Sequence, residues 1–275
     1  MFNQSIDFLK SYSDHKSKSY KFSKFIKQIS KDPCFSTPDT WKKRFESTST
    51  CGSFLTFGHK SSDSSYNKLI GANFCKYRFC PMCAWRKAQK NYGQTRKMVD
   101  FINDPSFLVQ NNISYTGKVR YLFLTVTVKN CKIDDLMENI DNLLWSWSHR
   151  FMRRKVIKDA VLGAVRHLEV TYNDKNDTFH PHLHSILCVS DKYFSDSYIK
   201  TEEYARIFKK CLKLDYTPIC DCRAIKGDQI ENAVAEVTKY SCKPSDFEGV
   251  YAPYVIEALD MVLSGRRIIS YSGII

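Results

Sequence analysis

No apolar run in this chain approaches the length of a membrane-spanning helix, and the first seven residues lack the hydrophobic core of a secretion signal. These absences argue against integral membrane and exported proteins, and they predict a soluble, cytoplasmic protein. Acidic residues are also scarce, since 29 of them stand against 42 basic residues, for a net charge of +13. This imbalance predicts a polyanionic partner, with nucleic acid ahead of an anionic membrane surface.

The sequence also lacks the even, regularly spaced cysteines of a disulfide scaffold. It has eleven cysteines, and several lie singly in apolar runs, namely Cys131, Cys188 and Cys211. In a reducing compartment such residues act as small hydrophobic side chains. The 275 residues are enough for one large domain or two small ones, with an ample core.

Three histidines at a spacing of two mark the middle of the chain. His180, His182 and His184 alternate with Pro181 and Leu183. Side chains alternate across a strand, so the three imidazoles share one face. A lone histidine is usually a satisfied core residue, whereas three on one strand face favour a metal site. His180 could orient a ligand or replace one, and the sequence leaves its role open.

An acid is predicted to face these histidines across a hairpin. A strand-like run ends at Tyr172, and an Asn/Asp-rich turn separates it from Phe179. If the turn centres so that these two aromatic residues pair, Glu169 lies directly opposite His182. A carboxylate and two histidines on one sheet face can bind a divalent metal ion. The predicted ligands are Glu169, His182 and His184.

A separate cysteine cluster is typical of zinc. Cys80 and Cys83 form a C-x2-C knuckle, with Cys75 just before it and Cys51 further upstream. A thioredoxin-like redox pair would not need the additional cysteines. We therefore predict one structural zinc ion on these four sulfurs, because four protein ligands close its shell. His59 is the alternative to Cys51.

Two segments carry many basic residues and no acid. Residues 16–31 contain six lysines, and residues 76–97 contain seven basic residues interleaved with aromatic ones, Tyr77, Phe79, Trp85 and Tyr92. A charge run is usually a solvated helix face. In a nucleic-acid enzyme the first segment suits phosphate contact, and the second suits phosphate contact with base stacking.

A candidate nucleophile lies near the C-terminus. A helix is predicted from Asp228 until Pro244 stops it, and along it Glu236, Tyr240 and Lys243 follow at spacings of four and three, on one stripe. A lone surface tyrosine carries little information. A tyrosine with a carboxylate one turn before and a lysine one turn after, on a short helix that follows the histidine strand, is a candidate nucleophile.

Four segments in order resemble the plasmid rolling-circle replication initiators, the Rep proteins of small Gram-positive plasmids. These belong to the HUH endonuclease superfamily, in the class with a single catalytic tyrosine. The segments read FCKYRFCPMCAWRK (74–87), FLTVTVKN (123–130), HPHLH (180–184) and EVTKYSCK (236–243). The histidine triplet alone is weakly specific, whereas four motifs in order are strong. The resemblance covers the chain from about residue 50 to its last residue. Members of this family lead us to expect further residues after that point.

The resemblance implies an α+β fold. We expect an antiparallel central sheet with helices on one side, the histidine triplet on a central strand and the tyrosine on a facing helix. The predicted organisation has three parts: a basic, mainly helical segment (1–50), a zinc-binding cysteine region (51–115) and an HUH endonuclease domain (116–275).

The resemblance also implies a metal-dependent nicking and joining enzyme for origin DNA. Tyr240 would attack a phosphate held against Mg²⁺ or Mn²⁺, leaving a 5′-phosphotyrosine and a free 3′-OH. Either the metal or Lys243 would favour the phenolate, and Glu236 would act as general base in the terminating cleavage. Expected partners are the double-stranded origin site, its single-stranded nick site, a host helicase and polymerase, and a second copy in a homodimer, with no membrane.

Rival functions explain fewer of these features. A histidine-triad nucleotide hydrolase shares the histidine spacing but not the basic charge, the cysteine block or the Glu236–Tyr240 pair. A non-catalytic zinc protein that binds DNA leaves Glu169, His182, His184 and Tyr240 without a purpose. HUH relaxases and transposases share the chemistry, and the cysteine block favours a replication initiator over them.

Overall fold

The computed structural model describes residues 2–35, 37–60, 63–102, 104, 106, 117–242, 247 and 249–274, with the backbone alone for residues 2–9, 59–60 and 63–67. The chain forms two compact units. The first comprises Met1–Ala88 and Lys243–Met261, and the second comprises Gln89–Cys242 and Val262–Ile275. The three-part organisation expected from the sequence stays a prediction.

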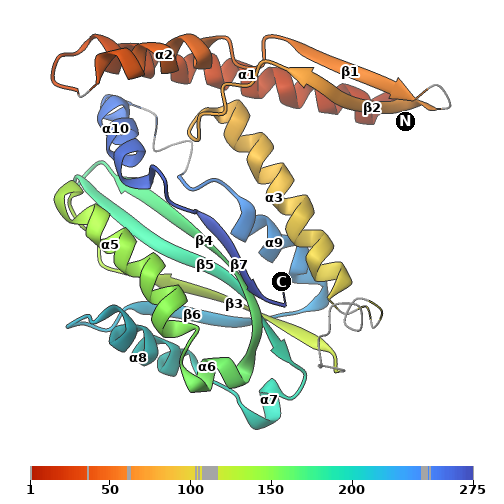
Figure 1. Cartoon of the computed structure of the whole chain (residues 1–275), viewed down its shortest axis with the longest axis vertical. Coiled ribbons are helices and arrows are strands. Elements are labelled where there is room, and N and C mark those ends of the chain that lie inside the picture. Colours follow the sequence, from red (N-terminus) through yellow and green to blue (C-terminus); the bar gives the residue numbers. More distant parts are fainter. Residues whose placement is uncertain are drawn as a thin grey trace. The chain divides into compact units, whose positions relative to one another are not determined.

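The first unit is mainly helical. It contains α1 (Phe2–Lys31), α2 (Pro38–Ser49), the hairpin of β1 (Leu55–Lys60) and β2 (Asp63–Ala72), the start of α3 (Pro81–Phe101) and most of α10 (Ala252–Leu263) (Figure 1). In α1, Phe22, Ile26 and Ile29 are buried. Their spacing of four and three places them on one face of the helix. The lysines from Lys18 to Lys31 are exposed.

The second unit is built on a five-stranded antiparallel sheet. Its strands are β3 (Val119–Thr127), β4 (Val161–Asn173), β5 (Thr178–Ser190), β6 (Ile219–Ile225) and β7 (Ile269–Gly273), in the order β6-β3-β5-β4-β7. The predicted antiparallel sheet of an α+β protein is confirmed. The histidine triplet lies on β5, which is the central strand, as predicted.

Helices cover both faces of this sheet, not one face as expected. The elements on one side are α5 (Ile133–Ser146), a π-helical turn (Trp147–Phe151), α6 (Lys155–Ala160), a short α7 (Tyr193–Asp196) and α8 (Thr201–Leu212), and the main helix on the other side is α9 (Ile230–Thr238), which follows a 3-10 turn (Gly227–Gln229) (Figure 1). Both α5 and α9 pack against β5. On β5, Ile186 and Leu187 point to opposite faces and both are fully buried. A strand that is apolar on both faces needs cover on both.

The hairpin of β4 and β5 has the predicted register. Tyr172 pairs with Phe179, and Glu169 pairs with His182. The side chain of Asn173 accepts hydrogen bonds from two backbone N–H groups of the turn. An asparagine that closes a turn in this way fixes where the chain reverses, and with it every cross-strand pair.

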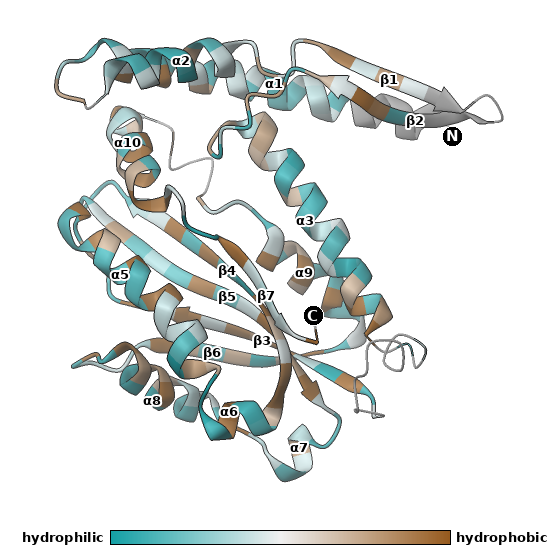
Figure 2. Cartoon of the chain, in the orientation of Figure 1, coloured by the Kyte–Doolittle hydropathy of each residue, from teal (hydrophilic) through white to brown (hydrophobic). Residues whose placement is uncertain are grey.

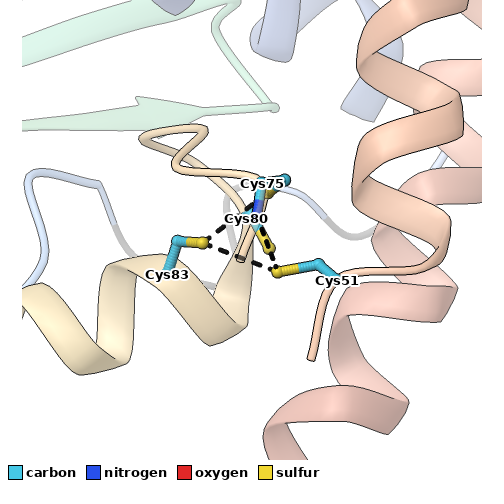
Figure 3. A group of neighbouring side chains, drawn as sticks. All are labelled: Cys51, Cys75, Cys80 and Cys83. Carbon is cyan, nitrogen blue, oxygen red and sulfur yellow. Dashed lines mark hydrogen bonds between the residues drawn. The ribbon is translucent and has the colours of Figure 1, made fainter. Parts of the chain in front are cut away.

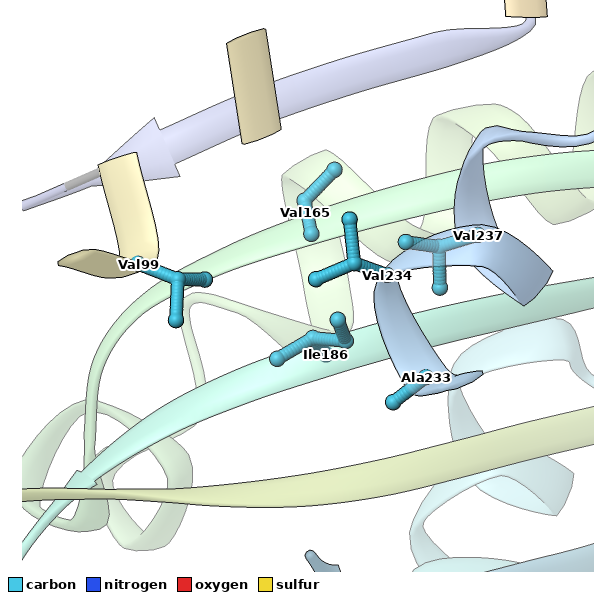
Figure 4. Close-up of a cluster of buried hydrophobic side chains, with 6 residues drawn as sticks. All are labelled: Val99, Val165, Ile186, Ala233, Val234 and Val237. Atoms are coloured by element: carbon cyan, nitrogen blue, oxygen red, sulfur yellow. The ribbon is translucent and has the colours of Figure 1, made fainter. Parts of the chain in front are cut away.

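Many hydrophobic residues lie in the strands of the sheet and in α10 (Figure 2). One cluster fastens α9 to β4 and β5 through Val234 and Val237, which pack with Val165 and Ile186 (Figure 4). This packing sets the position of α9 on the face of the sheet that carries His182 and His184. Within the part of the chain that the structure describes, no helix has both the length and the apolar composition to cross a bilayer.

Candidate metal centre and nucleophile segment

Glu169, His182 and His184 meet on one face of β4 and β5. The Nε2 atoms of both histidines lie 2.9 Å from Oε2 of Glu169. The ligand atoms of the three residues all lie within 4.8 Å of one another. Strand alternation produces this arrangement, because Glu169 pairs with His182 and His184 is two residues further along β5. The structure therefore brings the three predicted ligands together.

The pair of His182 and Glu169 has the donor pattern of a cation site. Nδ1 of His182 lies 3.2 Å from the backbone oxygen of His180. The carbonyl oxygen can only accept, so Nδ1 carries the proton of this contact. In a neutral imidazole the other nitrogen, Nε2, then has no proton, and its lone pair points toward Glu169. A lone pair and a carboxylate oxygen at 2.9 Å repel each other unless a proton or a metal ion lies with them. The residues present therefore fit a divalent metal ion.

Glu169 is charged although it is only 1% exposed. Burial alone would raise the pKa of its carboxyl group, but the contacts of that group with His182, His184 and Lys239 outweigh burial and hold the pKa well below its usual range. The second oxygen, Oε1, is buried and has no hydrogen-bond partner among the residues described. A buried carboxylate oxygen without a donor is costly, and a bound cation would remove that cost.

Lys239 joins this group, although no sequence pattern assigned it a role. Its Nζ atom lies 3.0 Å from Oε2 of Glu169, and it also forms an ion pair with Glu236. In the predicted helix it lies three residues after Glu236, which indicates an ion pair on the helix face and not a contact with Glu169. Its ammonium group shares the oxygen that both histidines approach.

We expect Lys239→Met to bind Mn²⁺ more tightly than the wild type. The substitution removes a positive charge beside the ligand oxygen, and the side chain is 30% exposed, so solvent screening keeps the gain to roughly three- to tenfold, or about 0.7–1.4 kcal/mol. Isothermal titration with Mn²⁺ measures it. Lys226→Met, at an exposed lysine before α9, is the control. Equal affinities in Lys239→Met and the wild type would contradict the expectation.

Tyr240 follows α9 instead of lying on it. The helix ends at Thr238, and Lys239 continues in extended backbone. The predicted helical stripe through Glu236 and Tyr240 is therefore wrong, and Lys243, its third member, lies outside the described residues. The helix ends early because the next residues bind β4.

The two neighbours of Tyr240 hold it beside the candidate metal centre. Lys239 contacts Glu169 through Nζ, and the backbone oxygen of Ser241 accepts the N–H of Val170 at 2.9 Å. Val170 follows Glu169 directly on β4, so both contacts lie at one place on that strand. Burial raises the pKa of the Tyr240 phenol.

Glu236 lies at the edge of the same group. Its Oε1 is 3.7 Å from Nε2 of His184, and its nearest partner is the ammonium of Lys239. The packing of α9 on the sheet (Figure 4) places it there. Its side chain is 39% exposed, so solvent can reach it.

Two further histidines flank the centre. His180 holds His182 through its backbone oxygen, and the ring centres of the two residues lie 5.4 Å apart. His167 pairs with His184 across the strands and is buried. Burial lowers the pKa of His167 to about 3. This histidine is therefore neutral near pH 7 and places no positive charge next to the ligands.

The four predicted cysteines of the first unit also come together (Figure 3). The sulfur of Cys83 lies 3.6 Å from those of Cys51 and Cys75, and the four sulfurs, with Cys80, lie within 4.8 Å of one another. Thiolates arranged tetrahedrally at about 2.3 Å from zinc would be roughly 3.8 Å apart. The cluster fits a zinc ion. The side chain of His59, the alternative ligand, lies outside the described residues.

The cluster also holds α1 in place. Ser19 is buried on α1, and its hydroxyl lies 3.3 Å from the sulfur of Cys80 and accepts the N–H of Met82 at 2.9 Å. A metal ion on these sulfurs would therefore stabilise the contact between the knuckle and the basic helix.

We expect the purified protein to carry about one zinc ion per chain. Cys83→Ser should lose the metal and make the first unit sensitive to protease, because a structural zinc site contributes directly to folding. Mass spectrometry of metals and limited proteolysis measure the two effects. Cys34→Ser, at an exposed cysteine outside the cluster, should keep its zinc. A wild-type protein without zinc would contradict the assignment.

The aromatic residues between Lys76 and Lys97 pack inside their own units. Phe79 is buried and contacts Tyr77, and Trp85 stacks on His15 with ring centres 4.5 Å apart. Tyr92 packs in a core cluster of the second unit. These residues do not support the predicted base stacking, because the spacing of aromatic residues does not show which side of a helix is covered. Several lysines of the segment remain exposed: Lys76, Lys87, Lys90 and Lys97.

Comparison with known proteins identifies relatives over most of the chain. A family model described as "Replication protein" matches residues 66–275. A "Protein rep" of Streptococcus pneumoniae serotype 2 is 36% identical over 234 residues, covering 83% of this chain and 69% of that protein. A "Protein rep" of a Bacillus species is 36% identical over 258 residues (86% and 79%), and one of Staphylococcus aureus is 30% identical over 246 residues (87% and 95%). No solved structure matches.

The matched range spans both candidate centres except for Cys51, and it includes Glu169, His182, His184 and Tyr240. Among the alternatives that the sequence left open, the relatives select the replication proteins. The chain belongs to the Rep family of plasmid rolling-circle replication initiators.

Proposed function

We propose that this replication protein nicks one strand of its plasmid origin and rejoins it by metal-dependent HUH chemistry, with Tyr240 as the nucleophile. The observation that carries the proposal is the attachment of both neighbours of Tyr240 to β4, beside Glu169. Family membership supports a role in plasmid replication and, with it, the binding of origin DNA.

In the proposed step, the phenol oxygen of Tyr240 attacks the scissile phosphorus in line with the 3′-oxygen. The new P–O bond to tyrosine forms as the P–O3′ bond breaks, so one phosphodiester replaces another. The phenol loses its proton and the 3′-oxygen gains one. Glu169, His182 and His184 would hold Mg²⁺ or Mn²⁺, which when bound neutralises charge on the non-bridging oxygens. Rejoining is the reverse attack by a 3′-OH.

The remaining residues have supporting roles in the proposal. Glu236 is a general base that activates a water molecule or a second strand end in the terminating cleavage. Lys243 is the cation that favours the phenolate of Tyr240. Lys239 orients Glu169 and the segment that carries the nucleophile.

Recognition of the duplex origin belongs, in this proposal, to the first unit. The exposed lysines of α1 are spaced three and four apart, at Lys18, Lys21, Lys24, Lys27 and Lys31. Such a row suits contacts with successive phosphates. The contact of Ser19 with Cys80 ties this helix to the cysteine cluster. A host helicase, a polymerase and a homodimer stay predictions.

The direct test uses a single-stranded oligonucleotide from the cognate origin, with Mn²⁺ and wild-type protein. A label at the 5′ end follows the released fragment with its 3′-OH, and a label at the 3′ end follows the strand attached to protein. We expect a shorter 5′-labelled product and a 3′-labelled adduct that survives denaturation. Cleavage without an adduct would contradict the tyrosine mechanism. Binding of the oligonucleotide without cleavage would contradict the proposed nicking activity.

We expect Glu236→Ala to separate initiation from termination. The nucleophile remains, so the first nick should proceed, whereas loss of a general base typically slows its step by ~10²–10⁴-fold. Accumulated multimeric plasmid product measures the defect. If Glu236 only pairs with Lys239, the substitution should cost about 0.2–0.5 kcal/mol and termination should stay near normal. Glu231→Ala, an exposed acid at the start of the same helix, is the control.

A further inference from the structure

An exposed aromatic and cationic surface lies on the second unit, away from the metal centre. Trp145, near the end of α5, is 48% exposed, whereas Trp147 is buried. The helix α5 packs on β5 from the side opposite to α9 (Figure 1). The proposed nicking reaction therefore makes no use of Trp145.

A π-helical turn brings two partners to the Trp145 ring. The N–H of Met152 donates to the backbone oxygen of Trp147, five residues earlier, at 3.0 Å. His149 stacks on Trp145 with ring centres 4.8 Å apart and planes 12° apart, and Cζ of Arg150 lies 4.5 Å from the centre of the indole. In a regular α-helix the neighbours of a side chain lie three and four positions away, so Arg150, five positions after Trp145, would not reach the ring. Such turns are rare and frequently occur at functional sites.

Positive charge continues along the chain from this stack. No acid occurs between Trp145 and Lys158. Arg150 also donates to the backbone oxygen of Cys211 at 2.6 Å, which holds it against α8. Beyond the turn, four cationic side chains are exposed: Arg153, Arg154, Lys155 and Lys158. Arg154 is held at the sulfur of Cys211, whereas the other three extend the surface. We call Trp145, His149, Arg150, Arg153, Lys155 and Lys158 together the Trp145 surface.

We propose that the Trp145 surface binds single-stranded DNA on the side of the sheet away from the metal centre. The assignment of that strand to the opened origin rests on the proposed function. Unpaired bases have free faces that extend a stack such as that of Trp145 and His149, and cations beside the stack meet the phosphates. Duplex DNA hides these faces. An acidic protein would account for the cations but not for the exposed, stacked ring.

The test measures binding of a labelled oligo-dT by anisotropy in EDTA, so that neither an origin sequence nor nicking is needed. Because stacking contributes about 1–3 kcal/mol per base, Trp145→Ala should weaken binding by roughly 5- to 150-fold. Trp145→Tyr, which keeps an aromatic face, should restore most of the affinity. Arg153→Ala/Lys155→Ala should lower the slope of log K against log salt by about 1.4.

Phe194→Ala is the matched control. Phe194 is also exposed and carries an arginine, Arg120, at 4.9 Å from its ring centre, and it lies in the same unit. The affinity of Phe194→Ala for oligo-dT should be within about twofold of that of the wild type. Wild-type affinity in Trp145→Ala, or equal losses in Trp145→Ala and Phe194→Ala, would overturn the proposal. A wild-type protein that binds oligo-dT through Trp145 yet fails to nick its origin would refute the proposed function alone.

Discussion

Tyr240→Phe is expected to abolish both nicking and the covalent adduct, with a loss on the order of 10⁴-fold or more. The substitution removes the one oxygen that forms the proposed phosphotyrosine and leaves the ring to fill its place. The contacts of Lys239 and Ser241 with β4 do not involve the phenol, so the fold should persist. Oligonucleotides labelled at either end measure cleavage and attachment separately.

Tyr172→Phe is the matched control for this substitution. Tyr172 lies on the same strand as Glu169, but three residues away, so its side chain points to the other face of the sheet. Its hydroxyl donates to Asp177 in the hairpin turn. The Tyr172→Phe variant should therefore nick DNA at the wild-type rate. An adduct that persists in Tyr240→Phe and disappears in Tyr172→Phe would move the nucleophile to the hairpin.

The pH dependence of nicking should follow the same phenol. Burial raises the pKa of Tyr240, so at neutral pH nearly all of the phenol is protonated. The rate should then increase with pH across the neutral to mildly alkaline range, by up to about tenfold per unit, as the phenolate fraction grows. A rate independent of pH there would mean that attack by Tyr240 does not limit the reaction.

His184→Ala is expected to give the second largest loss, because it removes one of the two imidazoles that converge on the buried carboxylate of Glu169. Nicking should fall below detection, and Mn²⁺ binding should weaken by at least about tenfold. Duplex origin binding should remain, since phosphate contacts from basic residues supply most of that affinity. Titration with Mn²⁺, a nicking assay and a duplex shift assay measure the three properties.

His180→Ala is the control on the same strand. His182 uses the backbone oxygen of His180 and not its ring, so the alanine variant should keep the orientation of His182 and much of the activity. If His180→Ala loses Mn²⁺ as His184→Ala does, the ring of His180 is a ligand. Normal nicking by His184→Ala in Mg²⁺ would contradict the proposed HUH chemistry.

Several features of the two centres follow from local rules and were predictable. Strand alternation and the Asn/Asp-rich turn place Glu169 opposite His182, because the turn sets a register in which each side chain has one face. The C-x2-C spacing brings Cys80 and Cys83 together on one short segment. Histidine and cysteine are also chemically distinctive, so few of them need to be aligned before a metal site is indicated.

Other features depend on contacts between segments far apart in the chain. The apolar stripe of α9 predicts a helix but not its end at Thr238, since the backbone of Ser241 binds Val170 on a strand some seventy residues earlier. Lys239 reaches Glu169 for the same reason. Trp85 is interleaved with basic residues like a stacking residue, yet it packs against His15 of α1.

The sequence by itself determined which residues share a strand face, which cysteines form a knuckle and, through four ordered motifs, the family. Periodicity and turn chemistry act over a few residues, so these properties can be read locally. Only the tertiary structure decided that Lys239 contacts the carboxylate of Glu169, that Tyr240 leaves its helix, and that helices cover both faces of the sheet. Each of these depends on which distant backbone or side chain satisfies a polar group or covers an apolar one, and that choice is made by the packed chain as a whole.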